Sequence, residues 1–181
     1  DLGRRFAGWM EASRPDGDSH EPWFDFMIDL ARFEYSVFAM FDAEGNEGRP
    51  FATADTPDAE LRLQPAFALG SYAYPVAGYY HAVRRGEAPP LPAPAHSHLA
   101  LVRADYIIRT LPLSETQHAF LAAMLAGSSV AAALAEVSAR FELDLDEACH
   151  SWGDAQGSRS RWVEWGFFVA TGNRPSAADP Q

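Results

Sequence analysis

The stretch from Pro22 to Phe41 constrains the fold most, because it is apolar on nearly every side. Its sequence, PWFDFMIDLARFEYSVFAMF, places apolar residues three and four positions apart along two stripes, which predicts a helix. Ser19 and Pro22 suit the start of this helix, and the segment from Asp42 to Gly48 suits its end. A helix with so few polar positions is expected to be buried all round, so the pattern predicts the central core helix.

Composition limits the classes of fold and function. The 181-residue chain is 48% hydrophobic and 13% aromatic, which supplies ample core material and argues against disorder over most of its length. Its formal net charge of −11 disfavours nucleic acid and anionic membranes, since both attract clustered positive charge. No apolar run is long enough to span a bilayer. The single cysteine, Cys149, cannot form an internal disulfide and fits a cytoplasmic protein.

The remaining segments predict an α+β fold, mostly helical, with about six helices around a small three-stranded antiparallel sheet. One strand is expected in Leu61–Leu69. The other two are expected in Leu99–Arg103 and Tyr106–Leu111, as a hairpin with its tight turn at Ala104-Asp105. The helical patterns from Ser114 to Trp152 predict a winged-helix-like trihelical portion.

We expect one compact domain over residues 1–170. Within it, residues 1–95 are expected to form a helical part with the first strand, and residues 96–170 the hairpin and the C-terminal helices. Residues 171–181 are expected to be a disordered tail, since polar termini are seldom held in place.

Histidines are the strongest candidates for metal chemistry. His96 and His98 would place two imidazoles on one face of a strand, and His81 could add a third ligand. No cluster of cysteines or carboxylates accompanies them, so structural or surface histidines are expected. A small histidine-based metalloprotein stays open as an alternative.

The trihelical portion raises the further alternative of a DNA-binding transcriptional regulator. The helix from Ser129 to Phe141 would then be the recognition helix, yet Arg140 is its only base and it also carries Glu136. A DNA reader needs Arg, Lys, Asn or Gln at its exposed positions. A trihelical piece of the core or a winged-helix-like protein-binding module is therefore the favoured interpretation.

Several segments occur in the order seen in one bacterial family. These segments are DLARFEYSVFAMFD, LRLQPAFALGSYAYPV, LALVRADYIIRTLPLSETQHAFLAAMLAGSSVAAAL and WVEWGFF. Over most of Pro22 to Val169 the chain resembles the HvfC/BufC-type family, described as DNA-binding proteins of unknown function and functionally similar to the MbnC protein of methanobactin biosynthesis. Some members have a separate C-terminal domain, which this chain is expected to lack. The resemblance is carried by Leu30, Ala31, Arg32, Glu34, Leu63, Pro65, Ala66, Tyr74, Pro75, Val76, Arg103, Trp165, Gly166 and Phe168.

The resemblance implies a non-catalytic accessory subunit. Such proteins form a heterodimer with a multinuclear iron-dependent oxidase of TIM-barrel fold and hold the leader of a ribosomal precursor peptide. The iron is then expected in the partner, and no cofactor in this chain.

An extended peptide can bind by adding a strand to a free sheet edge, which we expect at Leu61–Leu69 or Leu99–Leu111. Aromatic side chains could dock the oxidase, although each one singly is expected to be ordinary core. The candidate residues for peptide or partner binding are Leu99, Leu101, Arg103, Tyr106, Ile108, Tyr79, Tyr80, Trp162 and Trp165.

Overall fold

The computed structural model describes residues 2–155 and 157–171, and it confirms the α+β class. The helices are α1 (Leu2–Ala12), α2 (Pro22–Asp42), α3 (Val76–Arg84), α4 (Glu115–Leu125), α5 (Val130–Phe141), α6 (Leu145–Gly153) and α7 (Ser158–Glu164), with 3-10 turns at Gly17–Ser19 and Asp58–Glu60. The strands are β1 (Leu61–Leu63), β2 (Phe67–Tyr72), β3 (Ser97–Ala104), β4 (Ile107–Leu113) and β5 (Phe168–Ala170). Beyond Thr171, the tail expected at 171–181 lies outside the described residues.

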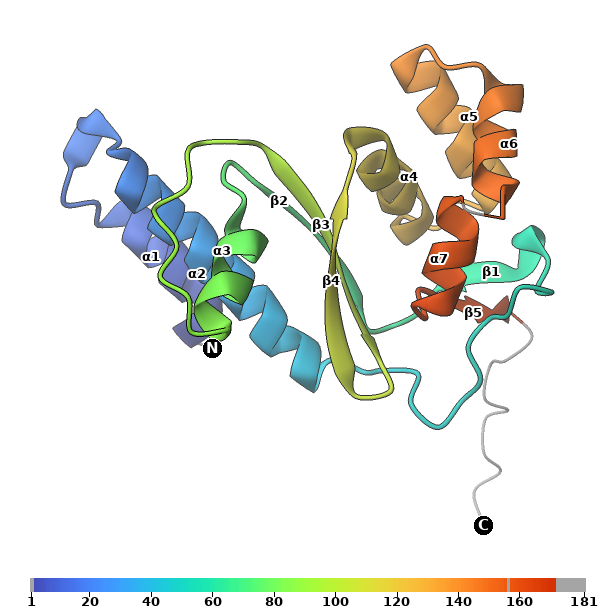
Figure 1. Cartoon of the computed structure of the whole chain (residues 1–181), viewed down its shortest axis with the longest axis horizontal. Coiled ribbons are helices and arrows are strands. Elements are labelled where there is room, and N and C mark those ends of the chain that lie inside the picture. Colours follow the sequence, from blue (N-terminus) through green and yellow to red (C-terminus); the bar gives the residue numbers. More distant parts are fainter. Residues whose placement is uncertain (1, 156, 172–181) are drawn as a thin grey trace.

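The predicted three-stranded antiparallel sheet is present, with strand order β2-β3-β4. α2 packs against one face, with α3 beside it, and α4 packs against the other face (Figure 1). Side chains therefore alternate along the central strand β3: Leu101 faces α2, whereas Val102 faces α4. The sheet thus separates a helical end made of α1–α3 from a second end made of α4–α7 (Figure 1).

The hairpin turn lies one residue later than predicted. Ala104 pairs with Ile107, so Asp105 and Tyr106 form the two-residue loop, with φ of 52° and 63°. Positive φ at both loop residues is the geometry that matches the twist of the flanking strands. Tyr106 is therefore a turn residue, 78% exposed, and not the first residue of a strand.

The strand expected at Leu61–Leu69 is divided in two. β1 pairs with β5, with Leu61 opposite Ala170, in a separate two-stranded sheet, whereas β2 joins the larger sheet. The division falls at Pro65, which has no backbone N–H to give to a ladder. The neighbouring Gln64 is buried there, where its Nε2 donates to the Arg103 carbonyl at 2.6 Å and its Oε1 accepts from the Ala66 N–H at 3.2 Å. β5 is thus a strand that the sequence patterns did not predict.

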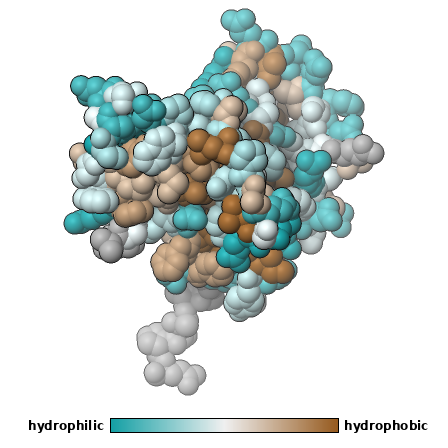
Figure 2. Space-filling model, turned by 60° about the vertical axis from the view of Figure 1, so that its left-hand side comes forward, coloured by the Kyte–Doolittle hydropathy of each residue, from teal (hydrophilic) through white to brown (hydrophobic). Residues whose placement is uncertain are grey.

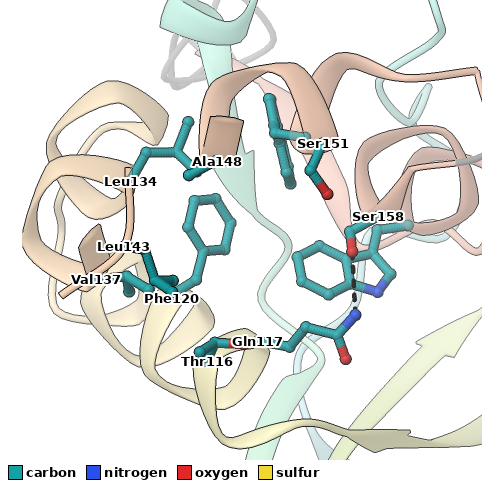
Figure 3. A pocket seen from close by; sticks show the side chains of 11 residues that line it. Thr116, Gln117, Phe120, Leu134, Val137, Leu143, Ala148, Ser151 and Ser158 are labelled. Atoms are coloured by element: carbon teal, nitrogen blue, oxygen red, sulfur yellow. Dashed lines mark hydrogen bonds between the residues drawn. The ribbon is translucent and has the colours of Figure 1, made fainter. Parts of the chain in front are cut away.

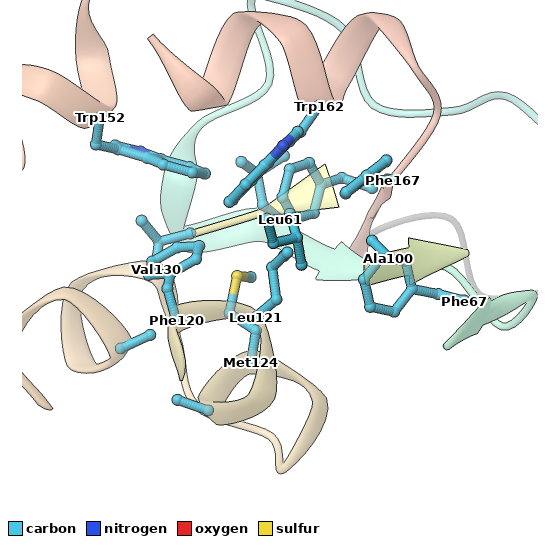
Figure 4. Close-up of a cluster of buried hydrophobic side chains, with 14 of the residues drawn as sticks. Leu61, Phe67, Ala100, Phe120, Leu121, Met124, Val130, Trp152, Trp162 and Phe167 are labelled. Carbon is cyan, nitrogen blue, oxygen red and sulfur yellow. The ribbon is translucent and has the colours of Figure 1, made fainter. Parts of the chain in front are cut away.

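Two apolar cores lie on opposite faces of the sheet. The first, under α2 and α3, centres on Phe26 and Phe33. The second, between α4–α7 and β1, contains Trp162 stacked on Phe167, with ring centroids 5.6 Å apart (Figure 4). β1 belongs to this second core although it precedes β2 in the chain, so segments from both halves of the sequence build it. The single domain over residues 1–170 stays a prediction.

α2 spans the predicted helix but is not buried all round. Phe26 and Phe33 are almost inaccessible, whereas Phe38 and Phe41 are each 62% exposed. Since α1, α3 and the sheet together cover only part of its circumference, one apolar face remains open. The expectation of a fully enclosed core helix is therefore wrong on that face.

Candidate functional site

The outer edge of β4 carries unpaired backbone groups. The Arg103 N–H donates to the Ala66 carbonyl at 3.0 Å, and the Arg103 carbonyl accepts from Gln64, so both point away from β4. Arg103 lies opposite Ile108 of β4. In an antiparallel pair the backbone groups of two opposite residues point either toward each other or both away, so the N–H and C=O of Ile108 point outward too. Because this arrangement repeats at every second residue, the N–H and C=O of Thr110 also point outward. We call the outward groups of Ile108, Thr110 and Pro112 the β4 edge.

The β4 edge is open along the part of the chain that the structure describes. No backbone hydrogen bond joins Ile108 or Thr110 to a segment outside the sheet. Pro112 has no N–H to offer and is tolerated there because its nitrogen faces away from β3, as prolines in edge strands do. Two residues thus present complete donor and acceptor pairs, enough to start pairing with a short extended segment.

The predicted binding residues on β3 do not lie at an edge. Leu99 and Leu101 are 3% and 0% exposed and sit on the central strand, with β2 and β4 on either side. Neither can pair with a peptide backbone or contact a partner, so the structure contradicts this part of the expected site. Of the residues expected on the strands, Ile108 lies on the edge itself and Tyr106 at the exposed hairpin tip.

Arg103 has a structural position. Its Nη1 donates to the carbonyls of Met40 at 2.6 Å and Phe41 at 2.5 Å, and its Nη2 to that of Ala43 at 2.8 Å. Its Nε donates to Glu47 at 2.7 Å, in an ion pair with both side chains about nine-tenths buried. These hydrogen bonds lower the pKa of the Glu47 carboxyl. Arg103 thereby satisfies carbonyls at the end of α2 instead of facing a ligand.

The aromatic residues expected to dock a partner are mostly core. Trp162 is 1% exposed, and Trp165 is half-buried against the second core. Tyr79 and Tyr80 are half-buried and lay their rings edge-on against α2, with centroid distances of 4.8 Å to Phe26 and 5.3 Å to Phe33. Both rings keep part of their surface exposed, so partner docking through them stays a prediction.

The exposed aromatic surface lies on α1 and α2. Along α2 the residues at positions 23, 27, 38 and 41 fall on one face, and α1 adds a stacked aromatic pair whose ring centroids are 6.1 Å apart. Figure 2, which brings this end of the molecule forward, shows apolar side chains gathered among polar ones. We call this surface the α2 stripe; it consists of Phe6, Trp9, Trp23, Met27, Phe38 and Phe41, which are 43–62% exposed.

A pocket lies between the C-terminal helices. Its floor is apolar, and Gln117, Ser151 and Ser158 form a polar rim (Figure 3). The Gln117 Nε2 donates to the Ser158 Oγ at 3.1 Å, which ties α4 to α7 across the rim. The cavity volume is about 150 Å³, and we call it the α4–α7 pocket; it is lined by Thr116, Gln117, Phe120, Leu134, Val137, Leu143, Ala148, Ser151, Trp152, Ser158 and Trp162.

Of the three predicted histidines, His96 and His98 lie together, with ring centroids 6.3 Å apart, whereas His81 lies apart from them. His81 Nε2 lies 2.6 Å from the Thr110 Oγ1 beside α3, whereas His98 faces α4. There Ser71 Oγ lies 2.8 Å from His98 Nδ1 and 3.3 Å from His118 Nε2. His118, which the sequence patterns missed, has its pKa lowered by burial first and by nearby positive charge second. Within residues 2–155 and 157–171, no three His, Cys, Asp or Glu side chains are placed to hold a metal ion.

Comparison with known proteins gives no match to a family model and none to a curated protein. Across the described ranges, none of the helices combines the length and apolar character needed to cross a membrane.

Proposed function

We propose that this protein is a non-catalytic recognition subunit that binds a multinuclear iron-dependent oxidase of TIM-barrel fold and the leader of a ribosomal precursor peptide. The proposal places the complex in the cytoplasm and the iron in the oxidase. The observation that carries it is the open β4 edge, where Ile108 and Thr110 direct unpaired backbone groups outward. A sheet edge of this kind is what an extended peptide needs in order to add a strand.

The β4 edge alone gives weak binding. A backbone hydrogen bond contributes about 1 kcal/mol net, and the outward groups of Ile108 and Thr110 allow only a few. Ordering the peptide opposes this gain, since fixing the backbone of each residue costs about 1–2 kcal/mol. Specific side-chain contacts must therefore add to the edge.

The α2 stripe is the proposed surface for the oxidase. Its six apolar side chains are each roughly half exposed, although burying them would be favourable. Contiguous exposed apolar surface on a soluble protein commonly marks a docking site for another protein. Because the stripe lies on α1 and α2, the oxidase and the peptide would meet the subunit on different elements.

The DNA-binding alternative has less support. α5, the expected recognition helix, exposes Glu136 as well as Arg140, and the guanidinium of Arg140 lies 5.1 Å from the ring centroid of Phe141. An acidic side chain at the surface of that helix would repel phosphate.

The peptide arm of the proposal is tested with Thr110→Pro. This change removes an outward N–H without breaking a bond to β3, so we expect the fold to persist and peptide binding to fall by about tenfold. Thr110→Val, which keeps the N–H, is the matched control for loss of the hydroxyl. Binding is measured by titrating a labelled leader peptide from the native host, with thermal unfolding as the check on folding. Equal affinity in both variants would reject the β4 edge.

The oxidase arm is tested by pull-down of the tagged chain from its native host, with metal analysis of the captured protein. Phe38→Glu together with Phe41→Glu should reduce capture of an iron-bearing partner at least about tenfold, because each change places a charge in the buried interface. Leu91→Glu is the matched control, since Leu91 is 49% exposed but lies in the connector after α3. Capture that is unaffected by the α2 changes, or a partner without iron, would contradict the proposal.

A further inference from the structure

The α4–α7 pocket continues toward β4. A second, more polar hollow is also lined by Leu111 and Pro112 of β4. The residues that it shares with the pocket are Gln117, Ser151, Ser158 and Trp162. The mouth of the pocket therefore opens beside the same strand whose outer edge is unpaired. A chain lying on the β4 edge would pass within side-chain reach of this mouth.

Two arginines lie on this side of the sheet. Arg161 lines the polar hollow from α7, and Arg109 shares the α4-facing side of β4 with Leu111. Among the described residues neither makes an ion pair, in contrast to Arg103 and Arg159, which are each bound to a carboxylate. Arg161 alone lines a hollow beside the pocket, so in a chain of net charge −11 its guanidinium offers a local site for a carboxylate.

The size of the cavity limits its occupant. A volume of about 150 Å³ holds one benzene-sized group and is well below that of a typical pocket for a larger ligand. The floor, formed by Phe120, Leu134 and Val137, is apolar, and Trp152 adds an aromatic wall. A phenyl ring or a branched aliphatic side chain fits this description.

We infer that the α4–α7 pocket binds a single apolar side chain, preferably a phenyl ring, carried by a segment with a carboxylate directed at Arg161. This inference rests on the proposed function, because the side chain that enters the pocket belongs to the precursor peptide. A third hollow, lined by Glu147 and Asp154, shares Ser151 with the pocket, and it shares Ser151 and Gly157 with the polar hollow. The carboxylate is placed on the β4 side of the ring because Arg161 lines the hollow that reaches Leu111 and Pro112.

The pocket is tested first with a small probe, 3-phenylpropanoate, on the full chain. Binding is followed by NMR through the indole N–H signals of Trp152 and Trp162, with those of Trp9 and Trp23 as internal references. We expect a saturable shift at the first pair alone. The neutral analogue 3-phenylpropanol should bind about two- to fivefold more weakly, because it lacks the charge that Arg161 attracts.

Two variants locate the site. Ala148→Leu fills the cavity and should abolish binding, whereas Arg161→Gln, an exposed change that leaves the floor intact, should weaken it about two- to fivefold. Arg5→Gln, another exposed arginine on α1, is the matched control and should bind as the parent does. No saturable shift at millimolar probe, or a shift that Ala148→Leu leaves unchanged, would overturn the inference.

The peptide then separates this inference from the proposed function. Changing the phenylalanines and leucines of the leader to alanine, one at a time, should reveal one position at which the affinity falls about tenfold, and Ala148→Leu should remove that preference. Thr110→Pro should lower peptide affinity but leave 3-phenylpropanoate binding intact. Probe binding without peptide binding refutes the proposed function and leaves the pocket standing. If the peptide binds but neither the alanine changes in the leader nor Ala148→Leu alter its affinity, the inference about the pocket is wrong and the proposed function stands.

Discussion

Replacing Arg103 with methionine is expected to destabilise the protein by about 3 kcal/mol. The variant keeps the apolar stem but leaves the Glu47 carboxylate and the carbonyls of Met40, Phe41 and Ala43 without their donor. Breaking a buried ion pair by removing one partner typically costs about 3–5 kcal/mol. The lower end applies because both side chains remain about 10% exposed, so some water can reach the abandoned groups. For a chain of this length, the change corresponds to a fall in Tm of about 6–12 °C.

Urea unfolding at neutral pH, followed by circular dichroism, measures this loss. Glu47→Gln should destabilise by only about 1 kcal/mol, because the amide oxygen still accepts from Arg103 and the three carbonyls still hold the guanidinium. The double variant should recover part of the stability lost in Arg103→Met alone, since the second change removes the uncompensated buried charge. Arg85→Met, which breaks only the exposed pair with Glu87, serves as the control and should leave stability unchanged. A loss below about 1 kcal/mol for Arg103→Met would refute the role assigned to this side chain.

The remaining predictions concern pH and the hairpin. The pKa of Glu47 is lowered in the folded protein. The stability that this carboxylate contributes is therefore complete above the ordinary pKa of 4.5 and is lost as the pH falls through the lowered pKa. Urea titrations in acid should show this loss of stability, and Glu47→Gln should make the loss smaller. The pKa of His118 is also lowered in the folded protein, so on acidification the unfolded chain takes up a proton first and stability falls as the pH drops below 6.5. His118→Gln should make the Tm depend less on pH in that range. Replacing Asp105-Tyr106 by Asn-Gly should raise the Tm by a few degrees, because both positions have positive φ, and calorimetry measures it.

Local patterns predicted most of the elements. Alternation and helical periodicity located α2, the hairpin strands and the C-terminal helices, since these signals depend on neighbours a few positions apart. α4 begins with a capping box, in which the Ser114 Oγ accepts from the Gln117 N–H and the Gln117 Oε1 accepts from the Ser114 N–H. β5 was missed because its three residues form a strand only by pairing with β1, more than a hundred positions earlier in the sequence. Such non-local pairing leaves no periodic signal in a single sequence.

The candidate site was harder to predict than the fold. Apolar content along α2 indicated burial, but it could not show that α1 and α3 leave Phe38 and Phe41 uncovered. Alternation identified Leu99 and Leu101 as strand residues, yet strand order alone decides which strand is central and which is an edge. The α4–α7 pocket arises where four helices meet. In the sequence, this pocket is marked by nothing more than the mixture of small and aromatic residues near Trp152 and Trp162.

The pairing of β1 with β5 also affects how the chain can fold during synthesis. Leu61 is made early, but its partner Ala170 is made only after every helix of the second core. The first core, which is built from α2, α3 and the larger sheet, can close once β4 has been made. The second core must instead wait for its last strand, with Phe67 and Ala100 exposed on the unoccupied face of the sheet meanwhile. On a translating ribosome this protein is therefore expected to expose an apolar sheet face to chaperones until synthesis passes β5.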